Sequence, residues 1–186
     1  MKKEKKEEKP RSKQSIVIEM VIYLVLILVC IFIIPRYVIQ RTVVDGKSME
    51  NTFVSGQSLL VEKVSKHFSD PKRYDIIVFY PHEIGGDEYY VKRLFGLPGE
   101  TIKITGNDIY INGSKIKDGY GKVPMRSGGI AETEIKLADD EFFVLGDNRG
   151  VSLDSRDPSL GPIKRANLVG KPILRIWPLN KFGTFK

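Results

Sequence analysis

Residues 16–34 form a continuous apolar run, IVIEMVIYLVLILVCIFII, in which Glu19 is the only charged residue. A helix of this length spans roughly 28 Å, close to the thickness of the hydrocarbon layer of a membrane. A cleaved signal peptide would usually have an apolar core of about 7–15 residues, followed by a cleavage site of small residues. This run is longer, and the RYVIQRTVV that follows has no such site. The sequence therefore predicts a retained transmembrane anchor over residues 15–35.

The charged residues before the run set the expected orientation. Residues 1–14, MKKEKKEEKPRSKQ, hold seven Lys or Arg and three Glu, which gives +4 of the net +7 of the chain. Basic residues beside a membrane span usually stay in the cytoplasm. We therefore expect a basic cytoplasmic tail at 1–14 and an extracytoplasmic domain at 36–186, in a single-pass protein of the cell membrane. The lipid bilayer is then one expected partner.

Two classes of function are disfavoured by composition. The residues after the tail carry only +3, with no basic helix or nucleic-acid motif, so we expect no nucleic-acid binding. Cys30 is the single cysteine, which excludes an intramolecular disulfide and leaves no cysteine cluster for zinc. We expect neither a metal nor another cofactor.

The exported part has the pattern of a β domain. Short runs rich in Val, Ile, Phe and Tyr alternate with turn signals, which predicts strands. The runs are SLLVEKV (58–64), DIIVFY (75–80), YYVKRLFG (89–96), TIKITG (101–106), DIYING (108–113), EFFVLG (141–146) and KPILRIW (171–177). Asn112-Gly113 between alternating apolar residues predicts a tight hairpin, and the polar, glycine-rich residues 118–136 predict a flexible excursion. The predicted fold class is mostly β, with long loops that can carry a site, preceded by one transmembrane helix.

Ser48, in the stretch VDGKSMENT (44–52), has three possible roles. A phosphate-binding loop would need a glycine at position 41, which is arginine, and a strand-then-helix context that is missing. A serine in a turn is the ordinary interpretation of a single such residue. A nucleophile would need a general base and a group that stabilises the oxyanion.

The candidate base is Lys92 rather than a histidine. His67 and His82 are the only histidines, and both lie in polar, loop-like segments without an orienting carboxylate. A lysine acts as a base only when neutral, and burial in apolar surroundings lowers its pKa. Lys92 lies in the apolar segment YYVKRLFG. Every second side chain of a strand points to the same face, which places Tyr90 and Lys92 together on one face. A solvated lysine remains the alternative at this point.

Four blocks of sequence together resemble the type I signal peptidases, the bacterial leader peptidases, of Gram-positive type. They are VDGKSMENT (44–52), RYDIIVF (73–79), YVKRLFGLPGE (90–100) and GDNRGVSLDSR (146–156), in the family's order. GKPILRIWP (170–178) is similar to the family's closing strand, so the resemblance covers most of the exported domain. It implies a signal-peptidase-like β domain and a membrane-bound serine endopeptidase that removes signal peptides from exported preproteins, after small-x-small sites such as Ala-x-Ala.

The resemblance also implies roles for individual residues. Ser48 matches the nucleophile of a Ser–Lys dyad, and Lys92 its general base. Ser152 matches the hydroxyl that orients the lysine. The polar positions that support the site are matched by Arg93, Asp147, Asp154 and Arg156. Where some members have a serine that binds the oxyanion, this chain has Gly46, so the oxyanion hole would depend on backbone N–H groups, chiefly that of Ser48. Met49 is a weaker candidate for the substrate pocket.

Other interpretations remain open. The block at 73–79 departs from the common family pattern. Where that pattern has Arg-Gly-Asp, this chain has Arg73-Tyr74-Asp75, and we expect the difference to change a turn rather than the chemistry. A self-cleaving repressor-type Ser–Lys protease would normally carry a DNA-binding region and no membrane span. A specialised signal peptidase for one substrate class and an inactive membrane-tethered accessory β domain are the alternatives, although an inactive domain would be expected to lose Ser48 or Lys92.

Overall fold

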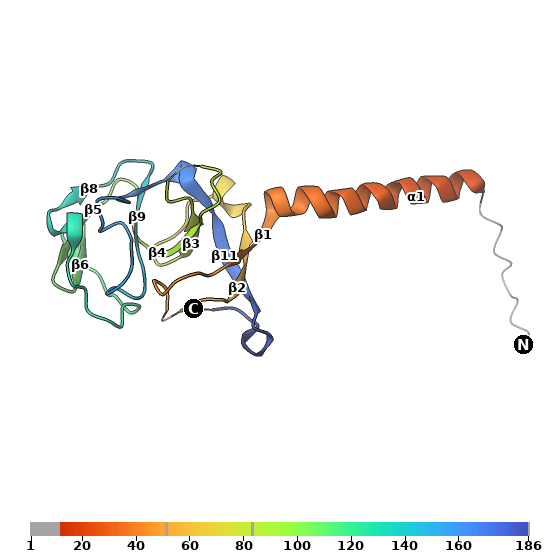
Figure 1. The fold of residues 1–186 in the computed structure, drawn as a ribbon. Coiled ribbons are helices and arrows are strands. Elements are labelled where there is room, and N and C mark those ends of the chain that lie inside the picture. Colours follow the sequence, from red (N-terminus) through yellow and green to blue (C-terminus); the bar gives the residue numbers. More distant parts are fainter. Residues whose placement is uncertain (1–11, 51, 83, 186) are drawn as a thin grey trace, which may run out of the picture. The chain divides into compact units, whose positions relative to one another are not determined.

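The computed structural model describes residues 12–50, 52–82 and 84–185, which divide into two units, one ending at Val38 and one starting at Ile39 (Figure 1). The first unit is a helix made from the apolar run. It begins as α1 (Lys13–Leu28) and continues as a π-helical segment, η1 (Val29–Val38). Its most apolar window has a mean hydropathy of 3.2 and no buried residue. The helix is therefore long and apolar enough to cross a bilayer.

The helix continues beyond the proline that ends the apolar run in the sequence. Pro35 lies inside η1 rather than after the helix. Proline has no N–H to donate within an α-helix, and the residues around it take the wider π-helical form instead.

The second unit is built on a seven-stranded antiparallel sheet with the order β1-β2-β11-β3-β4-β9-β10. Its strands are β1 (Ile39–Val43), β2 (Ser58–Glu62), β3 (Ile76–Phe79), β4 (Tyr90–Gly96), β9 (Glu141–Leu145), β10 (Ile163–Lys164) and β11 (Leu168–Trp177). Two short 3-10 turns lie between strands, η2 (Ser65–His67) and η4 (Arg165–Asn167), and a third, η5 (Leu179–Lys181), follows β11. The mostly β fold predicted from the sequence is confirmed.

A smaller four-stranded sheet has the order β7-β6-β5-β8. Its strands are β5 (Thr101–Thr105), β6 (Asp108–Ile111), β7 (Ser114–Lys115) and β8 (Ile135–Lys136). Asn112 and Gly113 have positive φ angles of 50° and 75° and connect β6 to β7. Two successive residues with positive φ are what a tight hairpin turn requires, so the predicted hairpin is confirmed.

The range 118–136 is irregular only in its first half. Gly129–Glu132 form a 3-10 turn, η3, and Ile135–Lys136 form β8, which pairs with Thr101 and Ile102 of β5. Ala131, within η3, is fully buried. The second half of the range is therefore regular structure rather than a loop, because one buried side chain and a short ladder attach it to the small sheet.

The central strands of the large sheet are buried on both faces. Ile76 and Val78 of β3 belong to one apolar cluster, whereas Ile77 and Phe79 belong to another. Successive side chains of a strand point to opposite faces, and here both faces are buried. This explains why the sequences of β3 and β4 are nearly continuously apolar. A charged residue in β4 must therefore enter the interior, whichever face it takes.

Candidate active site

Ser48 lies on a tight turn that follows β1. Gly46 has a φ of 83°, in the left-handed region that glycine adopts at little cost. After the serine, the Thr52 N–H donates to the Met49 carbonyl at 2.8 Å and closes one turn. The Ser48 carbonyl accepts a hydrogen bond of 2.9 Å from the Asn148 N–H. The turn that carries Ser48 is therefore joined directly to the GDNR segment.

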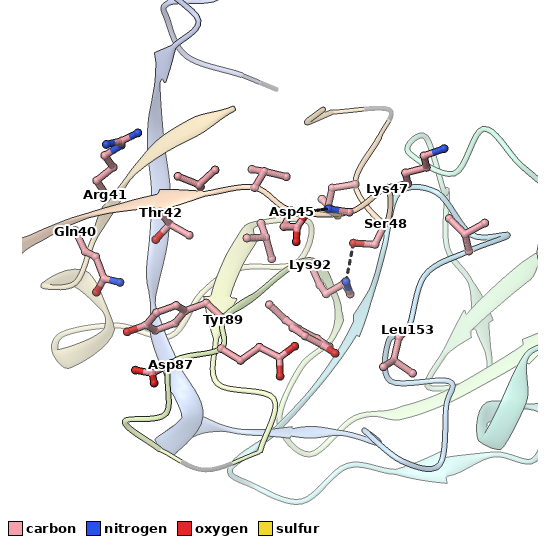
Figure 2. Close-up of a pocket in the computed structure, with 18 residues that line it drawn as sticks. Gln40, Arg41, Thr42, Asp45, Lys47, Ser48, Asp87, Tyr89, Lys92 and Leu153 are labelled. Atoms are coloured by element: carbon pink, nitrogen blue, oxygen red, sulfur yellow. Dashed lines mark hydrogen bonds between the residues drawn. The ribbon is translucent and has the colours of Figure 1, made fainter. Parts of the chain in front are cut away.

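Lys92 projects from β4 toward this serine. Its Nζ donates a hydrogen bond of 2.8 Å to Ser48 Oγ (Figure 2). The same Nζ lies 5.0 Å from the centroid of the Tyr90 ring. The residue is only 4% exposed. Burial lowers the pKa of Lys92 to about 8, although the carboxylate of Asp154 acts in the opposite direction. An amine with this pKa can accept a proton near neutral pH, as a general base must.

A groove of about 600 Å³ opens beside the two side chains (Figure 2). One wall is residues 40–49, which include most of β1, and the other is residues 87–92; Val151 and Leu153 complete the lining. β1 is at the end of the sheet and pairs with β2 on one side only. An edge strand beside an open groove can receive an extended peptide as an added strand.

Arg93, the neighbour of Lys92 in β4, forms a buried ion pair with Asp147. The Arg93 Nε and Nη2 atoms donate to the two carboxylate oxygens at 2.9 and 2.7 Å. Thr52 Oγ1 donates to the same carboxylate at 2.5 Å, and Arg93 Nη1 donates to the Tyr74 carbonyl at 3.0 Å. Because β4 alternates its faces, Lys92 and Arg93 lie on opposite sides of one strand. Because Asp147 accepts hydrogen bonds from both Arg93 and Thr52, its carboxylate connects β4 with the turn after Ser48.

A second buried ion pair holds the segment that follows. Arg156 Nε and Nη2 donate to the Asp154 carboxylate at 2.8 and 2.9 Å. The same carboxylate accepts from the Gly146 N–H at 3.0 Å, and Arg156 Nη2 donates to the Arg149 carbonyl at 2.9 Å. Asp154 thus fixes both ends of the loop 146–156 and also provides the negative charge that acts on Lys92.

Sequence reasoning assigned no role to four residues that contribute to this support: Thr52, Asp118, Tyr120 and Arg149. Arg149 donates to the Asp118 carboxylate, and although burial opposes ionisation of Asp118, these hydrogen bonds hold its pKa below the usual value. The Tyr120 ring lies 3.7 Å from the Arg93 guanidinium. Thr52 and Arg149 stand in recognisable blocks, but Asp118 and Tyr120 come from a segment with no motif, so only the fold shows their contribution.

Tyr74 departs from the family pattern in a way that the structure clarifies. It has a φ of 72°, in the left-handed region where glycine is preferred. Its hydroxyl donates to the Lys117 carbonyl at 2.9 Å, and its ring meets that of Phe95 edge-to-face and that of Tyr120 at a tilt. A tyrosine at position 74 therefore carries some backbone strain. Its side chain contacts Lys117 and Tyr120 and so connects this segment with the residues that support the site.

The remaining predicted positions lie in the same region with different contacts. Ser152 Oγ is buried and has no hydrogen-bond partner among the residues that the structure describes. The Gly46 N–H donates to the Asp45 carboxylate at 2.8 Å, so it is already engaged. Met49 lines the groove but is only 2% exposed and packs mainly in the core.

His67 and His82 are both exposed, as expected for solvated histidines. Within residues 12–50, 52–82 and 84–185, no group of three or more His, Cys, Asp or Glu side chains is placed to hold a metal ion.

Comparisons with known proteins place the chain in a family. The model of a family described as "Signal peptidase, peptidase S26" matches residues 17–177. Signal peptidase I of Bacillus amyloliquefaciens is 34% identical over 189 residues, covering 98% of this chain and 100% of the relative. Signal peptidase I of Leptolyngbya laminosa is 38% identical over 156 residues, covering 81% and 74%.

A solved structure gives a further match. The crystal structure of a signal peptidase I from Enterococcus faecalis V583 is 30% identical and covers 55% of this chain and 97% of its own, with a TM-score of 0.44. The family model and the curated relatives decide the assignment, because they extend over most of the chain. The chain belongs to the signal peptidases of the peptidase S26 family and is an enzyme of the signal peptidase I type.

Proposed function

We propose that this protein is a membrane-anchored serine endopeptidase that cleaves signal peptides by a Ser48–Lys92 dyad. The observation that carries the proposal is the 2.8 Å hydrogen bond between Lys92 Nζ and Ser48 Oγ, made by a lysine whose pKa burial lowers to about 8. At this pKa roughly a fifth of the lysine is neutral near pH 7.4, against about one in a thousand for an unperturbed lysine.

The dyad supplies both proton transfers of peptide hydrolysis. Neutral Lys92 takes the proton of Ser48 Oγ as the oxygen attacks the scissile carbonyl carbon. The resulting ammonium gives that proton to the leaving amine, and the peptide bond breaks to leave an acyl ester on Ser48. Water then attacks the ester, with Lys92 again accepting the proton and returning it to Ser48. No metal or other cofactor takes part in these steps.

The oxyanion would be stabilised by the backbone around Ser48. The Ser48 N–H is the proposed donor, whereas the Gly46 N–H is held by Asp45. A Cβ added at Gly46 would meet nothing within 4 Å, so its positive φ, rather than lack of space, accounts for the glycine. Gly46 then contributes by permitting the turn that presents the Ser48 N–H.

Ser152 is proposed to orient the lysine. Its Oγ is buried. A Cβ added to Gly146 would lie 2.1 Å from this Oγ and 2.6 Å from the Ser48 carbonyl oxygen, so the two oxygens are both close to Gly146. The hydroxyl is therefore next to the turn that carries the nucleophile. The ammonium formed during catalysis has three donors and makes one hydrogen bond to Ser48, which leaves others for Ser152.

The groove beside the dyad suits a substrate in extended form. Such a peptide pairs its backbone with an edge strand, and alternate side chains face the protein. Two inward positions two residues apart, beside Val44 and Thr42, would then read the small residues of a small-x-small site. The buried Met49 side chain reduces the depth beside Ser48 and favours a small residue there.

The anchor is proposed to keep the enzyme at the extracytoplasmic face of the membrane, with the N-terminus in the cytoplasm. The charge of residues 1–14 and the apolar helix Lys13–Val38 support this orientation. Exported preproteins are held in the same bilayer by their signal peptides. Tethering both reactants raises the effective concentration of the cleavage site.

The direct test uses the full-length protein in detergent with a preprotein that has an Ala-x-Ala site. We expect one cut after the second alanine, mapped by mass spectrometry of both products. Ser48→Ala and Lys92→Ala should each lower kcat by at least about 10³, because a nucleophile and its base act as a unit. An uncleaved preprotein would favour an inactive accessory domain, and appreciable activity in either variant would exclude the dyad.

A further inference from the structure

One short segment, residues 117–121, contacts two arginines that adjoin the proposed catalytic groups. The guanidinium carbon of Arg93, in the same strand as the proposed base, lies 3.7 Å from the centroid of the Tyr120 ring. Asp118 accepts hydrogen bonds from both terminal nitrogens of Arg149, with Nη2 at 3.0 Å. The segment therefore reaches the site from two sides, although no step of the mechanism uses it.

The segment is itself held in place. The Tyr74 hydroxyl donates to the Lys117 carbonyl at 2.9 Å, which fixes its start. Asp118 Oδ1 accepts a hydrogen bond of 3.3 Å from the Gly121 N–H. A Cβ added to Gly121 would lie only 2.9 Å from the guanidinium carbon of Arg149, so the glycine lets the backbone pass close to this group. The Asp118 carboxylate is thus presented to Arg149 in one position.

Arg149 transmits this contact to the loop that holds the Ser48 turn. Its Nε donates to the Gly146 carbonyl at 2.9 Å within the same loop. The preceding residue, Asn148, makes two contacts with the turn. Its N–H donates to the Ser48 carbonyl at 2.9 Å, and its Nδ2 donates to Glu50 Oε2 at 3.2 Å. The position of Arg149 therefore helps to set the position of the turn.

The loop also has little freedom at Gly146. A Cβ added there would lie 2.1 Å from Ser152 Oγ and 2.6 Å from the Ser48 carbonyl oxygen. Groups packed this closely pass a displacement on to their neighbours. A shift of the Arg149 side chain would therefore reach both serines.

The arrangement depends on the negative charge of Asp118. The side chain of Arg149 is only 1% exposed, and that of Asp118 is 15% exposed. A buried guanidinium that loses its counter-charge is strongly unfavourable, so it moves toward water or another acceptor. The loop that carries Arg149 would move with it.

We propose that Asp118 is a positioning residue for cleavage, which acts through Arg149 to fix the loop that holds the Ser48 turn and the Ser152 hydroxyl. This inference rests on the proposed function. The competing role is a purely structural one, in which the pair stabilises the fold without affecting the chemical step. The two roles differ in what happens when both charges are removed together.

Asp118→Asn should lower kcat by about tenfold or more, because a small displacement of a reacting group is costly to the rate. KM should stay within about two-fold of wild type. The walls of the groove that receives the peptide are residues 40–49 and 87–92, whereas Asp118 acts from outside it. The loss should therefore fall on the chemical step rather than on substrate binding.

The experiment compares full-length wild type with Asp118→Asn, Arg149→Met and the double variant. Each is assayed in detergent on a short Ala-x-Ala peptide, with kcat normalised to the folded fraction from circular dichroism. All three variants should have a similarly low kcat, because residues that act as a unit are not additive. The double variant should regain the stability that Asp118→Asn loses, since no uncompensated charge remains, without regaining kcat. Asp108→Asn, whose partner Lys115 is 57% exposed, is the control and should change neither.

The outcomes separate this inference from the proposed function. If wild type does not cleave the peptide, the proposed function is wrong and the inference falls with it. If wild type cleaves and Asp118→Asn has an unchanged kcat, the role of Asp118 is overturned and the dyad stands. A double variant that regains both stability and kcat would show that the pair is only structural. Should Asp118→Asn fail to fold, the double variant decides: a folded but slow enzyme supports the inference, and a wild-type kcat overturns it.

Discussion

At the scale of single residues, the chemistry depends on one amine held away from water. Lys92 is 4% exposed, and apart from Arg93 the other buried side chains of its strand are apolar. Its pKa falls because burial disfavours the charged form, and the carboxylate of Asp154 limits the fall. A base of this kind has a cost, since the folded protein must tolerate a poorly solvated ammonium whenever the lysine is protonated.

This cost predicts that Lys92→Met stabilises the fold while abolishing cleavage. The pKa of Lys92 is about 8 when folded and 10.5 in the unfolded chain. Below about pH 8 both states are protonated, and the folded state bears the full penalty, of the order of 3 kcal/mol. Between about pH 8 and about pH 10.5 the unfolded chain binds the extra proton, so wild type gains stability as pH rises.

Chemical denaturation of wild type and Lys92→Met at about pH 7 and about pH 10 measures this linkage. Methionine should be the more stable form at the lower pH, and its advantage should shrink at the higher pH. An equal difference at both pH values would show that the pKa of Lys92 is not lowered by folding.

At the scale of elements, β4 and the loop 146–156 hold the site through buried ion pairs. Arg93 and Asp147 have side chains only 3% and 1% exposed. Such pairs add little net stability compared with an apolar pair, but removing one partner leaves the other charge buried and uncompensated.

Asp147→Asn should therefore destabilise the domain by about 3–5 kcal/mol, because it leaves the Arg93 guanidinium without its counter-charge. The unfolding midpoint in denaturant, followed by circular dichroism, checks this. Asp108→Asn is the matched control, since the Lys115–Asp108 pair at 2.7 Å has side chains 57% and 44% exposed, and exposed pairs contribute little. Similar losses in the two variants would mean that the buried pair has no special part in the fold.

The sequence predicts elements well where local patterns determine them. The strands at Ile76–Phe79 and Tyr90–Gly96 lie within runs of β-branched and aromatic residues, and the hairpin follows from Asn112-Gly113. The regular structure at residues 129–136 was not predictable in this way. Gly128 and Gly129 suggest a loop, whereas contact with the small sheet and the burial of Ala131 order the segment.

At the scale of the whole molecule, the site combines segments that are far apart in the chain. Ser48 and Lys92 could be paired from the family resemblance, because each stands in a specific block. Asp118 and Tyr120 could not, since neither belongs to a motif and their contacts with Arg149 and Arg93 depend on the path of the chain between β7 and η3. The buried Thr42 hydroxyl, which has no hydrogen-bond partner among the residues that the structure describes, is likewise evident only from the packing around it.

The division of the chain at Val38 predicts that residues 39–186 fold without the helix. All three apolar clusters lie within this unit. A chain starting at Ile39 should cleave a short soluble peptide with a kcat/KM within a few-fold of the full-length enzyme. On precursors reconstituted in liposomes it should be slower by about 10² or more, because the tether no longer raises the effective concentration. Equal loss on both substrates would indicate that the helix is needed for folding.

The central claim is that Lys92 is the general base of Ser48, and the pH dependence of cleavage tests it most directly. With the full-length enzyme and an Ala-x-Ala peptide, kcat/KM should rise about tenfold per pH unit on the acid side. It should level off near the Lys92 pKa of about 8. A rate that is flat from about pH 6 to about pH 10, or one that levels off near the histidine pKa of about 6.5, would contradict the account.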